Sequence, residues 1–151
     1  MKVLQLCNKA PYPKKDGGCI AIASISQAFY NQGVDIRILT VTTDKHPWEE
    51  HAWPNQLKPI TSHIKIDTKF SPIEALKNIL GRGSYNIDRF YSKGFERKLE
   101  DEIANFNPDV IWMESLFMSP YIEVIRTLSK AKIILRAHNI EFKIWQQMST
   151  N

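Results

Sequence analysis

The chain has 151 residues, 43% of them hydrophobic, and a net charge of +4 from 20 basic and 16 acidic side chains. This composition predicts one domain of ordinary size with a single core. No run approaches the roughly 20 apolar residues of a membrane span, and the apolar run in the opening MKVLQLC is too short for a signal peptide, so we expect a cytoplasmic protein. The basic residues are scattered and form no stripe or nucleic-acid-binding module, which argues against nucleic acid and favours phosphate-bearing small molecules or anionic lipid headgroups.

Apolar runs alternate with amphipathic segments along the whole chain. Gly33 is placed to cap one helix at its carboxyl end, and Ser71-Pro72 is a typical helix start. One stripe of Tyr91, Phe95, Leu99 and Ile103 repeats every fourth residue, as on one face of a helix that Asn107-Pro108 then stops. In chain order we expect a strand at 2–7, a helix at 20–33, strands at 34–43 and 63–67, helices at 71–80 and 88–106, a strand at 109–114, a helix at 119–130, a strand at 132–137 and the start of a further helix.

The segment 44–59 is aperiodic and holds three prolines, so we interpret it as a loop that leaves and rejoins the domain. Its tryptophans, Trp48 and Trp53, more often anchor such a loop to a core than form a platform for sugar or lipid. His46, Glu50 and His51 look like metal ligands but lack a further ligand nearby, so we expect no metal site there. The two cysteines of the chain, Cys7 and Cys19, are expected to be small buried thiols.

Continuous apolar strands that alternate with helices predict a parallel sheet covered on both faces. Right-handed crossovers then give an α/β fold in three α/β/α layers, a Rossmann-like doubly wound sheet with strand order 3-2-1-4-5. Ligands bind such sheets outside the carboxyl ends of the strands, where the strand order reverses. The loops at that edge read NKAPYPKKDGG, ESLFMS and HNIE.

Gly17 and Gly18 precede the apolar part of the first helix. A glycine pair there lets backbone N–H groups approach an anion such as a diphosphate; the alternative is a loop that needs glycine only for its conformation. There is neither G-x-G-x-x-G nor G-x-x-x-x-G-K-[ST]. Pro11 and Pro13 stiffen the approach to the pair. Three charged residues near the loop tip either contact a ligand or form a solvated surface: Lys14, Lys15 and Asp16.

Two further pairs end strands at the same edge. His138 is placed to hydrogen-bond a sugar hydroxyl or a phosphate. The alternative has Asn139 as a helix N-cap with Glu141 in the first turn, and both arrangements are compatible. Glu114 and Ser115 end the strand at 109–114 and are candidate contacts, with a solvent-facing carboxylate as the alternative for Glu114.

The segments APYPKKDGGCIAIASISQAF and RAHNIEFKIWQQ, in this order, resemble the N-terminal half of GT-B glycosyltransferases, most closely the retaining family 4. The resemblance covers nearly the whole chain. It implies that residues 1–151 are the acceptor-side domain of a transferase that moves a sugar from a UDP- or GDP-linked donor to a glycan or lipid-linked acceptor, as in cell-envelope polysaccharide synthesis. Gly17 and Gly18 would then face the donor diphosphate, and His138 would be the catalytic residue that faces the transferred sugar. The resemblance and the loop positions give five candidate acceptor or sugar contacts: Asn139, Glu114, Ser115, Lys15 and Asp16.

The sequence departs from this family in one respect. It holds no second domain and no E-x7-E region, so we expect the donor-binding C-terminal domain to be absent from this chain and the isolated domain to be inactive. The resemblance implies no cofactor and no metal held by Asp-x-Asp, and it allows peripheral contact with the inner face of a membrane. Two alternatives are a free-standing Rossmann-like module that binds a glycan or nucleotide without catalysis, and a dinucleotide oxidoreductase fragment with Asp44 as its ribose acid, although the glycine-rich turn of that class is missing.

Overall fold

Five parallel strands form one sheet in the order β3-β2-β1-β4-β5. The structure, a computed structural model, describes residues 1–67 and 90–137. The Rossmann-like strand order predicted from the sequence is confirmed. The strands are β1 Lys2–Cys7, β2 Asp35–Thr42, β3 Thr61–Lys65, β4 Val110–Glu114 and β5 Lys132–Arg136.

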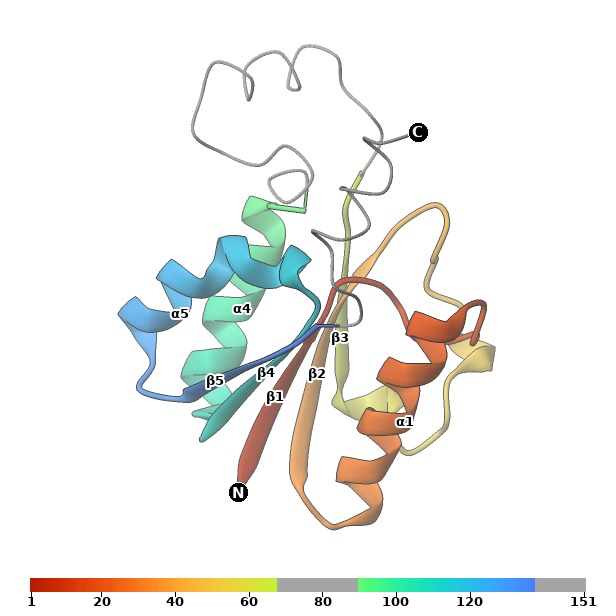
Figure 1. Cartoon of the computed structure of the whole chain (residues 1–151), viewed down its shortest axis with the longest axis horizontal. Coiled ribbons are helices and arrows are strands. Elements are labelled where there is room, and N and C mark those ends of the chain that lie inside the picture. Colours follow the sequence, from red (N-terminus) through yellow and green to blue (C-terminus); the bar gives the residue numbers. More distant parts are fainter. Residues whose placement is uncertain (68–89, 138–151) are drawn as a thin grey trace, which may run out of the picture.

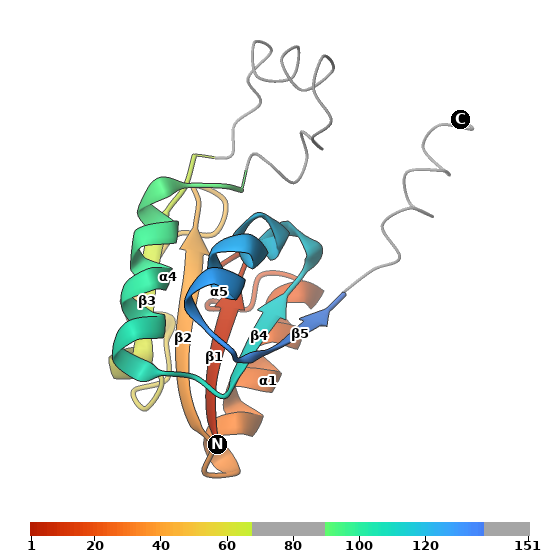
Figure 2. The same cartoon turned by 90° about the vertical axis from the view of Figure 1, so that its left-hand side faces the viewer.

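Helices cover both faces of this sheet, as the predicted three layers require. The helix α1 lies on one face, while α4 and α5 lie side by side on the other (Figures 1 and 2). The strands run upward in Figure 1, so that α1 begins at their carboxyl ends. The α-helices are α1 Gly17–Asn31, α4 Lys93–Phe106 and α5 Ile122–Leu128, and the 3-10 turns are η1 Glu50–Ala52, η2 Lys58–Ile60 and η3 Leu116–Tyr121.

The core has two parts, one on each face of the sheet. Because successive side chains of a strand point to opposite faces, Leu4 and Leu6 of β1 pack toward α4 and α5, whereas Cys7 packs toward α1. Trp53 from the long loop after β2 is buried in the second cluster, with its ring centroid 5.0 Å from that of Tyr12. The prediction that this tryptophan anchors its loop to the core is therefore confirmed.

The helix α1 begins three residues earlier than predicted because Asp16 acts as its N-cap. Its end follows the prediction: Gly33 adopts a φ of 68°. Gly33 N–H donates to Tyr30 O and Val34 N–H to Phe29 O, each at 3.0 Å, which is the hydrogen-bond pattern of a Schellman cap. The earlier start makes Gly17 and Gly18 the first two residues of the helix rather than part of the loop.

Two other helix starts were predicted too early. Ser92 caps α4, so Tyr91 lies outside the helix and is 42% exposed, and its predicted place in the apolar stripe is wrong. The stripe of Phe95, Leu99 and Ile103 is buried as predicted. The segment that contains Pro120 forms a 3-10 turn, so the α-helical part of 119–130 is only Ile122–Leu128.

Some predictions concern residues outside the described ranges. These are the helix at 71–80, the helix after residue 137, and the side chains of His138 and Asn139. Within the ranges 1–67 and 90–137, no helix has the length and apolarity that a membrane crossing requires.

Candidate functional site

The site predicted by topology lies between β1 and β4. These strands are neighbours, but the chain leaves β1 toward α1 on one face and β4 toward α5 on the other (Figures 1 and 2). The two connections diverge at the carboxyl ends of the strands, which is the switch point where doubly wound folds bind ligands. The residues at this point are the loop 8–16 with the start of α1, and the turn that begins at Ser115.

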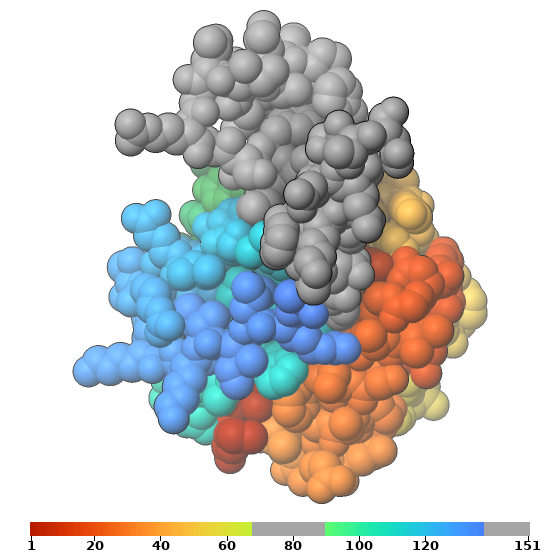
Figure 3. Space-filling view, viewed as in Figure 1, coloured from red at the N-terminus to blue at the C-terminus, as the bar shows by residue number. Residues whose placement is uncertain are grey.

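The start of α1 presents two unused donors. Asp16 Oδ1 accepts from Cys19 N–H at 2.8 Å, and Asp16 O accepts from Ile20 N–H at 3.0 Å. Within the described part of the chain, the N–H groups of Gly17 and Gly18 donate to no acceptor. A Cβ on Gly17 would meet no atom within 4 Å, and the loop and first turn form part of the surface in Figure 3 (red-orange). An exposed helix N-terminus with free N–H groups favours an anion.

Lys9 lies directly over this helix end. Its ammonium contacts Asp16 Oδ1 at 2.7 Å and Oδ2 at 2.9 Å. A Cβ at Gly18 would lie 2.7 Å from Lys9 Nζ, so a residue other than glycine would force the lysine to move. The space beside Gly18 therefore holds a cation already, which the sequence prediction of an empty anion cradle did not include. In the sequence, the one feature that could have pointed to Lys9 is its position, two residues after the end of β1.

The charged residues at the loop tip have partners within the protein. Lys15 Nζ pairs with Glu49 Oε1 at 2.8 Å and so connects the loop before α1 to the loop after β2. Burial raises the pKa of Asp16, but hydrogen bonds from Lys9 and from Cys19 N–H, together with the charge of Lys9, outweigh burial and hold this pKa well below its usual range. Asp16 is thus an ionised helix cap, and both side chains already have charged partners within the protein.

Glu114 does not face solvent, so the alternative of a solvent-facing carboxylate is wrong. Its side chain is fully buried under α1. Oε1 accepts from Gln5 Nε2 at 2.9 Å and from Trp112 Nε1 at 3.0 Å, and Oε2 accepts from Arg136 at 2.9 Å. Arg136 stands opposite Glu114 in the register of β4 and β5. The carboxylate links β1, β4 and β5, and an exposed ligand contact does not fit this position.

Ser115 adopts a backbone conformation that is rare outside glycine, with φ 97° and ψ 149°. Its hydroxyl accepts from Phe117 N–H at 3.4 Å, and its own N–H donates to Arg136 O at 2.9 Å. Residues held in this region cost about 1–3 kcal/mol and cluster at functional sites. Ser115 is therefore a site candidate on conformation as well as on position.

Asn8 was not singled out from the sequence. It follows β1 directly, and its Oδ1 is buried without a hydrogen-bond partner among the described residues. An unpaired buried acceptor calls for an explanation such as a bound ligand or water. The end of β1 thus presents an amide as well as the ammonium of Lys9.

A separate cavity of about 440 Å³ opens at the carboxyl ends of β2 and β3. Asp44, the ribose acid of the dinucleotide alternative, lines it but pairs with Lys65 Nζ at 2.8 Å. The Trp48 ring stacks on His63 with centroids 4.3 Å apart. The volume of this cavity lies in the range of roughly 300–1,000 Å³ that is usual for small-molecule sites. It is lined by Thr42, Thr43, Asp44, Pro47, Trp48, His63, Ile64 and Lys65.

Comparison with known proteins gives no further assignment. The chain matches no known protein family, and no curated protein is significantly similar to it.

Proposed function

We propose that this chain is the acceptor-side half of a GT-B glycosyltransferase, in which the start of α1 binds the diphosphate of a nucleotide sugar. The observation that carries the proposal is the pair of unused N–H groups on Gly17 and Gly18, with the Lys9 ammonium beside them, at the switch point of a Rossmann-like sheet. Two aligned N–H donors, a helix dipole and a cation all favour a diphosphate.

The chemistry follows from where charge develops during transfer. As the bond between the sugar and the diphosphate breaks, negative charge grows on the departing phosphate oxygen. Donors that are already oriented toward that oxygen stabilise the transition state without reorganisation. The Lys9 ammonium would either bond both Asp16 and the phosphate, or leave Asp16 for the phosphate. The flexible side chain of Lys9 allows both arrangements. By resemblance, His138 faces the transferred sugar and a second domain holds most of the donor.

The cavity at the carboxyl ends of β2 and β3 is the candidate acceptor site in this proposal, because it lies at the same edge of the sheet. Its mixture of threonine hydroxyls, an ion pair and an aromatic ring suits a glycan, since sugars offer both hydroxyl groups and apolar faces. A free-standing binding module would use the same residues without catalysis. Transfer activity distinguishes the two.

Calorimetric titration of the chain with UDP and GDP tests the proposal. Lys9→Met should weaken binding about 10–100-fold, since a hydrogen bond to a charged group contributes about 1.5–3 kcal/mol. The matched control is Lys15→Met, which removes a lysine of the same loop that is paired with Glu49 and should leave affinity within about twofold, as exposed ion pairs contribute little.

Gly17→Ala separately tests the approach of the nucleotide to the backbone N–H groups. A Cβ at this position meets no protein atom within 4 Å, so the fold should be unaffected and weaker binding would reflect the obstructed approach. Undiminished binding in both Gly17→Ala and Lys9→Met would place the nucleotide elsewhere. Sugar transfer by a protein that joins this chain to a donor-binding domain would support the transferase, whereas nucleotide binding without any transfer there would favour the binding module.

A further inference from the structure

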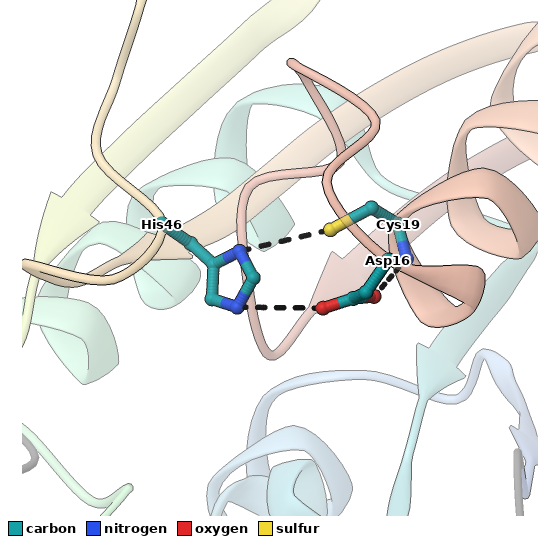
Figure 4. Close-up of side chains that lie close together, drawn as sticks. All are labelled: Asp16, Cys19 and His46. Carbon is teal, nitrogen blue, oxygen red and sulfur yellow. Dashed lines mark hydrogen bonds and ion pairs between the residues drawn. The ribbon is translucent and has the colours of Figure 1, made fainter.

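Three potential metal ligands converge where the loop after β2 meets the start of α1. They are Asp16, Cys19 and His46, and one ligand atom from each lies within 4.8 Å of the others (Figure 4). His46 Nδ1 is 3.7 Å from Cys19 Sγ, and His46 Nε2 is 3.6 Å from Asp16 Oδ2. In Figure 4 one edge of the imidazole ring faces both groups, with one nitrogen toward the Cys19 thiol and the other toward the Asp16 carboxylate.

The distance between Cys19 Sγ and His46 Nδ1 suits a small divalent ion, whereas the Asp16 carboxylate faces the other ring nitrogen, Nε2, which cannot bind the same ion. Zinc binds thiolate sulfur at about 2.3 Å, and imidazole nitrogen and carboxylate oxygen at about 2.0–2.2 Å, in a tetrahedron. Two ligands of such a tetrahedron lie roughly 3.3–3.7 Å apart. The sulfur and nitrogen of Cys19 and His46 are already at this spacing in the structure.

We propose that Asp16, Cys19 and His46 bind one Zn²⁺ ion, with water as the fourth ligand. The ion takes Nδ1 of His46, and the carboxylate of Asp16 swings toward that nitrogen. Asp16 is the most exposed of the three ligands, and its movement requires that Lys9 release at least one of the carboxylate oxygens. The site lies beside the donors on Gly17 and Gly18 but does not depend on the function proposed for them.

The other two ligands are held in place. Cys19 is fully buried in the first turn of α1. His46 is 9% exposed and is fixed by its backbone: its N–H donates to Thr43 Oγ1 at 3.1 Å, and its carbonyl accepts from Thr43 N–H at 3.0 Å. Because the ligand is the thiolate, binding of the ion would displace the thiol proton of Cys19.

Lys9 is the built-in competitor of the ion. Its ammonium bonds both oxygens of the Asp16 carboxylate and would have to give up at least one of them. Removal of this lysine should therefore tighten metal binding. The same substitution should weaken nucleotide binding, so the two proposals predict opposite effects of Lys9→Met and fail independently.

A cobalt titration of the whole chain tests the site, because Co²⁺ replaces Zn²⁺ and its bond to a thiolate gives a charge-transfer absorption in the near ultraviolet. We expect one Co²⁺ per chain, that absorption, and its loss when Zn²⁺ is added. Cys19→Ser and His46→Gln should abolish the absorption. The chain offers a matched control for each substitution. Cys7→Ala changes the other buried thiol, and His51→Gln changes a histidine of the same loop that is 85% exposed. Both control variants should retain the charge-transfer absorption.

Circular dichroism confirms that each variant is folded before the titration. If Cys19→Ser does not fold, His46→Gln decides the question. A folded wild-type chain without the absorption overturns the proposal, as does an absorption that persists in His46→Gln or disappears in Cys7→Ala. Tighter cobalt binding by Lys9→Met supports it, and weaker binding contradicts the placement of the ion at Asp16.

Discussion

Replacement of Glu114 by Gln should destabilise the fold, although the two side chains have nearly the same shape. Among the residues that the structure describes, Glu114 accepts hydrogen bonds from Gln5, Trp112 and Arg136. A glutamine has one oxygen and one NH2 group at this position. In either orientation of the amide, its NH2 faces at least one donor, so a buried bond is lost and a repulsion replaces it.

The expected cost follows from burial. Breaking a buried ion pair by removal of one charge costs about 3–5 kcal/mol. Arg136 keeps 28% of its side chain exposed and retains a hydrogen bond to Ala21 O at 3.2 Å, so water and this carbonyl offset part of the loss. We therefore expect about 3 kcal/mol, the lower end of that range.

Urea unfolding of the wild type and of Glu114→Gln, followed by circular dichroism, measures this cost. The matched control is Glu123→Gln on the exposed surface of α5, which should cost at most about 1 kcal/mol from the helix dipole. Equal midpoints for Glu114→Gln and the wild type would refute the structural role of this carboxylate and return Glu114 to the candidate ligand contacts.

Two further predictions concern Ser115 and Glu102. Ser115→Gly should raise the free energy of unfolding by about 1 kcal/mol because glycine tolerates the φ of 97°, whereas Ser115→Ala, which keeps the strain, should not; equal stabilities of the two variants in urea would contradict this. Burial raises the pKa of Glu102, but hydrogen bonds from Ser62, Arg37 and Lys98 outweigh it and lower that pKa below its ordinary 4.5. Because the folded-state pKa is the lower one, Glu102 stabilises the fold above about pH 4.5 and this contribution is lost in acid. The stability difference between wild type and Glu102→Gln should shrink as the pH falls below that value, and a difference that stays constant with pH would contradict the assignment.

The sheet could be predicted because its strands carry the information locally. The apolar residues of β1 and β2 form continuous runs, and the alternation of strands with helices leaves few possible orders. Helix starts were harder, since a cap depends on geometry that a pattern does not fix. Asp16 precedes two glycines of low helix propensity, which moved the predicted start of α1 to residue 20.

For the proposed site, the sequence indicated a location but not the arrangement of its charges. The glycine pair and the switch point were recognisable in the sequence, but the cation beside them was not, because Lys9 reaches Asp16 only after the loop has folded back. For Glu114 the sequence left a solvent-facing carboxylate open, yet the pleat turns this side chain under α1, where it pairs with Arg136 from the neighbouring strand. Such pairings join residues far apart in sequence and become visible only in the fold.

Two-dimensional amide NMR of the chain during titration with UDP and GDP tests the central claim most directly, since glycine amides report on the backbone itself. We predict saturable shifts of the Gly17 and Gly18 N–H signals, with Gly33 and Gly94 as internal references that lie outside the proposed site. The shifts should weaken in Lys9→Met and persist in Lys15→Met. Signals of Gly17 and Gly18 that stay in place while the nucleotide binds, or that move no more than those of the two reference glycines, would contradict the claim.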